Sequence, residues 1–573
     1  VKATRVVLRE RNRMEDDHKM SDGTPGKITR RNFTESVGIA AVAAALPRLA
    51  VAQSTRATAD RKNALDHIVV IMFENRSFDN VLGRLYGPGE VQSFEGVIGK
   101  NLSNPIPEWA ENGASRKLIE YGVATNMNTP TPDPGEEYPH INTDLFGVMD
   151  PKNRFMPLSK MVAPYNAPNP GQQPTMDGFI RDYISAFTSE MGRQPTYEEY
   201  AQIMTGYSPT QLPVTSSLAH GFATFDHWFC EVPSQTFTNR SFFHAATASG
   251  YVINFPPADA FPVHNTAETI FERLEAKGLA WRVYCDAPSP ASMTGIIHAA
   301  RLHGRFAKNF FTVADFLEDA KNGRLPNYAF IEPNLWHGHN DMHPPISALL
   351  HGLPWDPPSS LLGGEALLAK VYDAVRTSSA STGSNYLNTL LLVAFDEAGG
   401  TYDHVAPPAA PPPDAAAPPG QMGFTFDRSG QRVPAIAISA WIPQRRVITE
   451  EYRHTSLIRT LRERWSLGPP LTARDAVAPD IAPILSLETP RPPEQWPDVS
   501  PQPVPPFNTA LLPPNLPLSV LGKGIFFGIL AFEKSLGAKV PEISRDTDIT
   551  GAQAEEIMRN MSLDIFPGLR YSG

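Results

Sequence analysis

The chain has 573 residues, of which 41% are hydrophobic and 19% are charged, and its formal net charge is −10. This composition is typical of a soluble globular protein that is long enough to bury a large core. The acidic balance argues against binding to the phosphate backbone of nucleic acids.

Residues 1–52 have the features of a twin-arginine export signal. TRRNF (29–33) carries paired arginines, VGIAAVAAAL (37–46) is an apolar run, and AVA (50–52) supplies a small-residue cleavage pattern. An apolar run of about ten residues is too short to span a bilayer, and a short buried helix is the alternative. We expect the twin-arginine machinery to export the folded protein to the periplasm or the medium.

Apolar runs rich in β-formers recur between residue 65 and about 468, with amphipathic helices between several of them. The expected strands are HIVVIMF (67–73), AWRVYC (280–285), YAFI (328–331), LNTLLLVAF (387–395) and VPAIAISAWI (433–442). The expected helices are AETIFERLEAKG (267–278), EALLAKVYDAVR (365–376) and HTSLIRTLRERWSLG (454–468), the last with Thr455 as its N-cap. This alternation predicts an α/β fold with a mainly parallel sheet covered on both faces. Ligands of such sheets bind beyond the carboxyl ends of the strands.

The remaining segments predict an insertion and an extension around a main domain of residues 53–484. Residues 84–215 are rich in Pro, Gly and Asn and weakly periodic, which predicts a loop-rich insertion that caps the sheet. Residues 485–573 are expected to be a proline-rich connector and a helical extension. Within it, VLGKGIFFGILAF (520–532) is apolar enough to suggest transient contact with a membrane surface, but its shortness favours a helix docked on the domain.

Polar side chains follow three of the expected strands. They are Glu74 and Asn75, then Asn340, Asp341 and His343, and finally Asp396 and Glu397. Carboxylate and carboxamide oxygens suit hard divalent cations such as Ca²⁺ or Mg²⁺, although acidic residues also cap the helices that follow strands. The adjacent pair Asp396 and Glu397 favours the metal, because two neighbouring carboxylates repel each other unless a cation joins them.

A hydroxyl-rich segment lies between the first two of these strand ends. HWFCEVPSQTFTNRSFFHAATASG (227–250) contains Ser234, Thr236, Thr238, Asn239 and Arg240. Hydroxyls beside an arginine can form a nucleophile site in which the arginine stabilises developing negative charge. Turns and helix caps are the alternative interpretation of such a Ser/Thr cluster.

Seven sequence blocks in a fixed order resemble the bacterial phospholipase C and acid phosphatase family, which is related to the plant non-specific phospholipases C. The blocks are ENRSFDNVLG (74–83), MDGF (176–179), FDHWFCEVPSQTFTNRSFFH (225–244), EPNLWHGHNDMHPP (332–345), FDEAGGTYDHV (395–405), RVPAIAISAWI (432–442) and LTARDA (471–476). The resemblance implies an alkaline-phosphatase-like α/β/α sandwich, and it makes residues 53–484 a phosphoesterase catalytic domain that uses a metal.

The resemblance also implies roles for individual residues. Glu74 with Asn75, and Asp396 with Glu397, match the two metal-binding pairs for a Ca²⁺ or Mg²⁺ ion. Thr236 matches the nucleophile, which also contacts the metal and forms a phosphothreonine intermediate. The remaining matches are Asn239, Arg240, Asp341, His343, Asp403 and His404, and a histidine such as His343 or His404 is expected to protonate the departing alcohol.

Two positions depart from the family pattern. Ala398 stands in DEAGG where family members commonly have the histidine of DEHGG. Members also often have DPxH where this chain has DPGEEYPH (133–140), so a histidine with the same role would be displaced to His140. Contacts to the phosphate or the leaving group are therefore expected to differ.

The sequence leaves the substrate open between two kinds of phosphate ester. The blocks favour a phospholipase C that cuts phospholipid phosphodiesters over an acid phosphatase that takes small phosphomonoesters. A sulfatase is excluded, because neither Cys230 nor Cys285 begins a C-x-P-x-R motif. A non-catalytic binding protein is the remaining alternative, with Ala398 as its only support.

Overall fold

The computed structural model describes most of the chain beyond residue 58. The described residues are 59–254, 260–287, 291–335, 338–345, 360–505, 520–544, 549–550, 553–554, 556–558 and 566. They belong to one compact unit, Thr55–Gly573. The expected export signal, residues 1–52, lies outside the described residues and stays a prediction.

The unit is built on a sheet that has eight strands within the described residues. In spatial order they are β13 (Arg446–Ile448), β6 (Ala223–Phe225), β12 (Ala435–Ile438), β11 (Thr389–Phe395), β1 (His67–Phe73), β10 (Tyr328–Glu332), β8 (Trp281–Cys285) and β9 (Phe310–Thr312). Neighbouring strands are parallel except where β12 pairs with β11 and β6. The other seven strands therefore run in one direction, and their carboxyl ends meet at one edge of the sheet.

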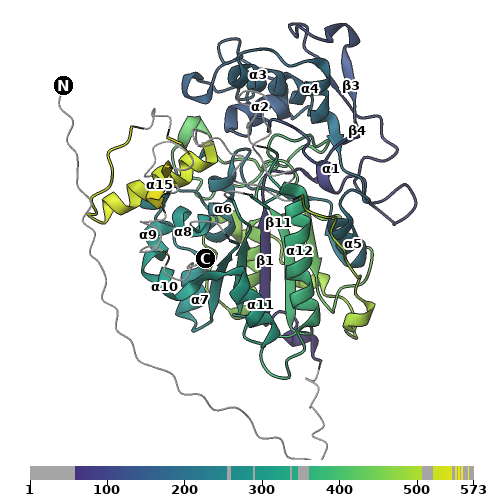
Figure 1. Cartoon of the computed structure of the whole chain (residues 1–573), viewed down its shortest axis with the longest axis vertical. Helices are drawn as coiled ribbons and strands as arrows, with labels where there is room; N and C mark the ends of the chain where they lie inside the picture. Colours follow the sequence, from purple (N-terminus) through teal and green to yellow (C-terminus); the bar gives the residue numbers. More distant parts are fainter. Residues whose placement is uncertain are drawn as a thin grey trace, which may run out of the picture. The chain divides into compact units, whose positions relative to one another are not determined.

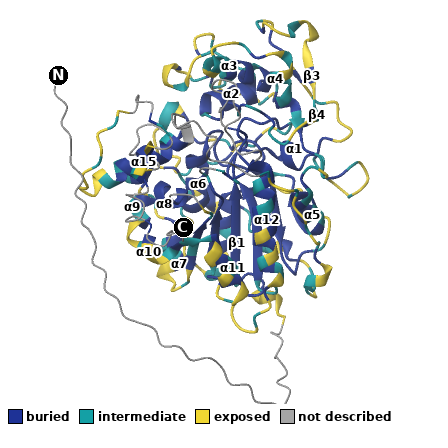
Figure 2. Ribbon diagram, viewed as in Figure 1, coloured by how far each residue is buried: buried dark blue, intermediate teal, exposed yellow. Residues whose placement is uncertain are grey.

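Strand β1 lies in the middle of this sheet and is buried on both faces. Every residue from Ile68 to Phe73 is fully buried, and Val70 pairs with Phe330 of β10 on one side and Leu392 of β11 on the other. Figure 2 shows the sheet as a continuous buried layer. A strand that is covered on both faces needs apolar side chains at every position, which is why HIVVIMF shows no alternation.

Helices cover both faces of the sheet. Successive side chains of a strand point to opposite faces, so Trp281 and Tyr284 of β8 lie on different faces. Phe271 contacts Trp281, with ring centroids 4.5 Å apart, while Phe316 contacts Tyr284 at 5.4 Å. The two phenylalanines belong to α7 and α11, which confirms the predicted α/β class with a mainly parallel sheet (Figure 1). The main covering helices are α5 (Pro213–Gly221), α6 (Thr236–Ala245), α7 (Ile270–Ala276), α11 (Val313–Lys321), α12 (Ser360–Thr377) and α13 (Thr455–Trp465).

Buried carboxylates from elsewhere in the chain satisfy the first turns of two of these helices. Glu231 Oε1 accepts the backbone N–H of Thr455 at 2.8 Å, so Thr455 is the first residue of α13 and not the N-cap that the sequence predicted. Glu365 of α12 accepts the N–H groups of Val214 and Thr215 at the start of α5. The expectation that Thr455 caps α13 was wrong, because the carboxylate of Glu231, far away in the chain, accepts a hydrogen bond from the first turn of the helix.

The predicted cap insertion, residues 84–215, builds a second hydrophobic core. Its main elements are β2 (Ser103–Pro105), β3 (Leu118–Glu120), β4 (Gly122–Val123), α2 (Tyr138–Phe146), α3 (Phe179–Met191), α4 (Tyr197–Ala201) and β5 (Thr205–Gly206). Figure 1 shows α2, α3 and α4 grouped beyond the ends of β1 and β11. Tyr402, which follows β11, packs into this second core and so joins the cap insertion to the sheet.

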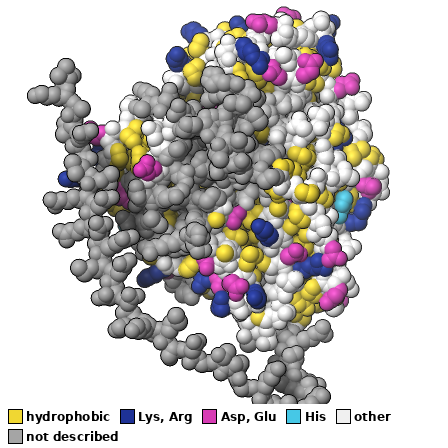
Figure 3. Space-filling model, viewed as in Figure 1, with side chains coloured by type: hydrophobic (Ala, Val, Ile, Leu, Met, Phe, Trp, Pro, Cys, Tyr) yellow, Lys and Arg dark blue, Asp and Glu magenta, His cyan; other side chains and the backbone are white. Residues whose placement is uncertain are grey.

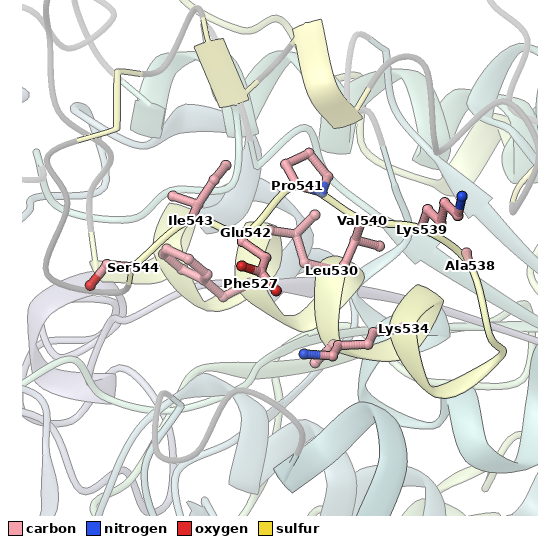
Figure 4. A pocket seen from close by; sticks show the side chains of 11 residues that line it. Phe527, Leu530, Lys534, Ala538, Lys539, Val540, Pro541, Glu542, Ile543 and Ser544 are labelled. Carbon is pink, nitrogen blue, oxygen red and sulfur yellow. The ribbon is translucent and has the colours of Figure 1, made fainter.

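Helix α15 (Val520–Ser535) docks on the main domain through apolar side chains. It packs against α8 (Met293–Ile297), and Phe526 and Ile529 are buried. Figure 4 shows the open groove between α15 and residues 538–544. No helix among the described residues has the length and hydrophobicity that crossing a membrane requires.

Charged side chains of both signs lie interspersed over the described part of the face in Figure 3. Such a mixture differs from the large single-sign surfaces that attract polyanions. The expectation that the protein binds no nucleic acid stays a prediction from its net charge.

Candidate active site

Two pairs of polar residues follow adjacent strands at the carboxyl edge of the sheet. Glu74 and Asn75 come directly after β1, and Asp396 and Glu397 come directly after β11. The register of β1 and β11 runs to the last residue of each strand, which places the two pairs side by side. The backbone N–H of Asn75 donates to Asp396 Oδ1 at 3.2 Å, and all four side chains are buried.

Helix α6 brings a hydroxyl and a guanidinium to these strand ends. Thr236 is its first residue, and Thr236 Oγ1 donates to Glu74 Oε2 at 3.0 Å. Arg240 lies one turn later on the same face of the helix. Its Nε donates to Asp396 Oδ2 at 3.0 Å, and its Nη2 donates to Glu74 Oε1. Arg240 thereby joins both strand ends to the helix that carries Thr236.

Asn239 holds the turn that precedes α6. Its Oδ1 accepts the backbone N–H groups of Glu231 and Val232, each at 2.9 Å. Its Nδ2 donates to the carbonyl oxygen of Ser234 at 2.8 Å. Because these bonds are all to backbone atoms, Asn239 fixes the position of the loop that leads to Thr236.

The loop after β10 supplies a third group of predicted residues. The backbone carbonyl of Asp341 accepts the N–H of Glu74 at 2.8 Å. The Asp341 carboxylate accepts the N–H of His343 at 3.0 Å and contacts His339 Nδ1 at 2.8 Å. His343 Nε2 lies 2.9 Å from Asn75 Nδ2. Asp341 therefore shapes the loop, and His343 is the side chain that reaches the strand ends.

Glu136 of the cap insertion also enters this site, although the sequence analysis did not single it out. Its two carboxylate oxygens accept from Asn75 Nδ2 and, at 2.7 Å, from Gln235 Nε2. His343 Nε2 lies 3.6 Å from Glu136 Oε2. Glu136 is the fourth residue of DPGE, the place where the family block has its histidine. That positional match was the signal that would have found it.

His140 contacts Asp182 and Glu137, and Glu136 is the residue of this segment that contacts Asn75. His140 Nδ1 is 2.9 Å from Asp182 Oδ1, and Nε2 is 3.8 Å from Glu137 Oε2. Burial alone would lower the pKa of His140, but the charge and hydrogen bond of Asp182 raise it to about 9. The pair is a buried ion pair that supports the cap insertion.

Asp403 and His404 belong to a separate buried charge cluster. Arg432 binds Asp403 through Nε and Asp79 through Nη2, each at 2.9 Å. His404 Nδ1 contacts Asp79 Oδ2 at 2.6 Å, and its Nε2 contacts Glu95 at 2.9 Å. Because cations already pair with these carboxylates, the cluster has the character of a structural network. Among the described histidines, two contact the strand-end residues: His343 Nε2 lies 2.9 Å from Asn75 Nδ2, and His454 Nε2 lies 2.6 Å from the backbone carbonyl oxygen of Asp396.

Burial perturbs the carboxylates of the first cluster strongly. It raises the pKa of Glu74 well above the usual range, even though Arg240 opposes the shift. Burial also raises the pKa of Glu397, and the neighbouring charges of Glu136 and Asp396 raise it further. Carboxylates crowded at one point in a buried site favour the uptake of protons or of a cation.

The residues present fit a divalent cation at this point. Within the described part of the chain, Glu397 Oε1 is buried and has no hydrogen-bond partner, and an unsatisfied buried acceptor is costly. Carboxylate, carboxamide and hydroxyl oxygens are the ligands that Ca²⁺ and Mg²⁺ take. The predicted ligands follow β1 and β11 or begin α6: they are Glu74, Asn75, Thr236, Asp396 and Glu397.

The ion pair of His140 and Asp182 predicts a pH dependence of stability. The pKa of His140 is about 9 in the folded chain and about 6.5 when unfolded. Its contribution to the free energy of unfolding is therefore fully present below about pH 6.5 and is lost as the pH rises through about 9. Asp182→Asn should remove this dependence and cost about 3 kcal/mol near neutral pH. Urea unfolding between pH 6 and 9.5 measures both effects.

The exposed Glu198 of α4 provides the matched control for this measurement. Glu198→Gln removes one carboxylate from the same cap insertion without touching His140, so its unfolding curve should follow the wild type at every pH. An Asp182→Asn variant that keeps the wild-type pH profile would contradict the assignment.

Comparison with known proteins places the chain in a family. It matches the model of the Phosphoesterase family over residues 65–468. It is 30% identical over 445 residues to non-specific phospholipase C3 of Arabidopsis thaliana, with 74% of each chain covered. It is 26% identical over 465 residues to phospholipase C A of Mycobacterium tuberculosis, with 74% of this chain and 78% of that one covered.

Among solved structures, a protein in the alkaline phosphatase superfamily from Vibrio parahaemolyticus aligns with a TM-score of 0.28 and 12% identity. The alignment covers 48% of this chain and 64% of that chain. The family match is much broader, and it includes both strand-end pairs and α6. The protein therefore belongs to the Phosphoesterase family and is a phosphoric ester hydrolase.

Proposed function

We propose that the protein is a metal-dependent phospholipase C in which Thr236 is the nucleophile. The observation that supports this most directly is the 3.0 Å hydrogen bond from Thr236 Oγ1 to Glu74 Oε2, inside the carboxylate cluster. A hydroxyl that attacks phosphorus needs a nearby group to take its proton. Glu74 suits that task, because its carboxylate oxygen already accepts the hydrogen bond of this hydroxyl.

The same cluster would hold the cation. The candidate ligands are Glu74, Asn75, Thr236, Asp396 and Glu397, an oxygen-rich set that favours Ca²⁺ or Mg²⁺. When bound, such an ion lowers the pKa of a hydroxyl and offsets negative charge on phosphoryl oxygens. Arg240 adds a fixed positive charge beside the ligands.

In the first half of the reaction, Thr236 Oγ forms a bond to phosphorus while the bond from phosphorus to the alcohol oxygen breaks. The hydroxyl proton passes to Glu74. Arg240 Nη1 has no hydrogen-bond partner in the described part of the chain, so it is available to donate to a phosphoryl oxygen. The product of this half is a phosphothreonine ester.

His343 is the group that protonates the departing alcohol. Burial lowers the pKa of His343, but the hydrogen bond and charge of Glu136 raise it to about 10, so it carries a proton at neutral pH. In the second half, water attacks phosphorus and gives a proton to the neutral His343. The bond to Thr236 Oγ breaks, and Glu74 returns its proton to that oxygen.

The names of the relatives support a phospholipid substrate. Both the plant and the mycobacterial proteins are named phospholipases C, enzymes that cut the glycerol side of the phosphodiester. Contact with a lipid surface would be transient, and the twin-arginine signal of residues 1–52 would deliver the folded enzyme to the periplasm or the medium.

Removing the Thr236 hydroxyl tests the nucleophile. Thr236→Ala should lower kcat by roughly a thousandfold or more while the fold and the metal content stay nearly normal. Thr238→Ala is the matched control, because Thr238 Oγ1 donates to the Tyr251 carbonyl away from the carboxylates. Steady-state kinetics and circular dichroism measure the effect, and a Thr236→Ala enzyme that keeps most of its activity would disprove the assignment.

The products of lipid hydrolysis test the substrate. Residues 53–573, incubated with phosphatidylcholine micelles and excess Ca²⁺ or Mg²⁺, should release phosphocholine that phosphorus NMR detects. Release of inorganic phosphate from small monoesters, with phosphatidylcholine intact, would favour the acid phosphatase alternative. A protein that turns over neither kind of ester would favour a binding protein.

A further inference from the structure

Glu136 is the carboxylate that the cap insertion adds to the site. Its side chain is 10% exposed, whereas those of Glu74 and Asp396 are fully buried. It contacts Asn75 and Gln235, the residues next to Glu74 and Thr236 in the chain. Glu136 is therefore separated from the proposed nucleophile, Thr236, by a single residue, Gln235. It enters the site from the side on which the cap insertion lies.

Close backbone contacts fix the position of this carboxylate. The N–H of Asp133 donates to the carbonyl of Pro345 at 2.9 Å, which ties the loop to the segment that carries His343. Gly400 adopts a positive φ of 63°, and a Cβ there would overlap the carbonyl oxygen of Gly135. The loop thus lies against the segment that follows Glu397, and the hydrogen bonds from Asn75 and Gln235 hold the Glu136 side chain.

The hydrogen bonds of Glu136 are those of an ionised carboxylate. One oxygen accepts from the amide of Asn75 and the other from the amide of Gln235. A protonated carboxyl would need an acceptor for its own O–H, and these two amide groups face it with donors. Glu136 therefore places a negative charge beside Asn75 and Gln235, within the proposed phosphoesterase site.

We propose, on the basis of the phosphoesterase mechanism above, that Glu136 is a specificity-determining residue that selects phosphodiesters and disfavours phosphomonoesters. A monoester carries nearly two negative charges above pH 7, because its second pKa is about 6, whereas a diester carries one. The carboxylate repels the additional charge of the monoester, and the imidazolium of His343, 3.6 Å from Glu136 Oε2, offsets part of that repulsion.

Removal of the charge should relax this preference. p-Nitrophenyl phosphorylcholine, a diester, and p-nitrophenyl phosphate, a monoester, share a leaving group. The kcat/KM of the diester divided by that of the monoester, at pH 8 with Mg²⁺, therefore measures the preference for the diester. In Glu136→Gln this ratio should fall roughly tenfold, a factor that corresponds to about 1.4 kcal/mol. Glu136→His, which also removes the negative charge, should change the ratio in the same direction.

Glu137→Gln is the matched control, because it makes the same charge change one residue along at a side chain that faces His140. It should keep the wild-type ratio. An unchanged ratio in both Glu136 variants would overturn the proposal. Loss of bound metal from Glu136→Gln would also overturn it, because Glu136 would then be a metal ligand.

Phosphate binding provides a readout that does not depend on turnover. Calorimetry at pH 8 with Mg²⁺ should show that inorganic phosphate binds about tenfold more tightly to Thr236→Ala/Glu136→Gln than to Thr236→Ala. Equal affinities would contradict the role of Glu136. Wild-type protein that hydrolyses neither ester would instead contradict the proposed function, and the phosphate comparison would still decide the role of Glu136.

Discussion

The burial of carboxylates at one edge of the sheet is the constraint on which the rest of the site depends. The side chains concerned are Glu74, Glu136, Asp396 and Glu397. A buried carboxylate costs several kcal/mol unless positive charge and hydrogen bonds compensate it. Arg240 and His343 supply part of that compensation, and the unpartnered Glu397 Oε1 marks where it is incomplete. A divalent cation at this point would balance the remaining negative charge. The same buried carboxylates would then determine both the stability of this region and the chemistry of the site.

The architecture divides the work between the sheet and the cap insertion. Parallel strands bring Glu74 and Asp396 together, because β1 and β11 are neighbours and end at the same level. The cap insertion has its own hydrophobic core and delivers Glu136 from above that edge. In the proposed mechanism the reacting groups lie at strand ends, while Glu136, the charge proposed to select the substrate, lies on a loop of the insertion. An insertion of this kind can alter substrate choice without disturbing the sheet.

Sequence patterns predicted the parts of this molecule that have a local signature. HIVVIMF could be assigned as a strand of a sheet that is covered on both faces, because it is apolar at every position after His67. The polar residues after it could be placed at a ligand site, because ligands of such sheets bind at the carboxyl ends of the strands. Strands β6, β9 and β13 have three residues each, too few to show a period. Glu136 was missed because its contacts with Asn75 and Gln235 are tertiary, although its place as the fourth residue of DPGE matches that of the family's histidine. The family pattern grouped His404 with the site, whereas its contacts run to Asp79 and Glu95.

Metal binding is the measurement that tests this account most directly. Protein stripped with a chelator would be dialysed against Ca²⁺, Mg²⁺, Mn²⁺ or Zn²⁺, and the bound metal counted by mass spectrometry beside a Glu397→Gln variant. The account predicts at least one divalent ion per wild-type chain, with affinity reduced tenfold or more in the variant while the fold is retained. A folded wild-type chain that binds no divalent ion at millimolar concentration would contradict it, because the buried carboxylates would then need no cation.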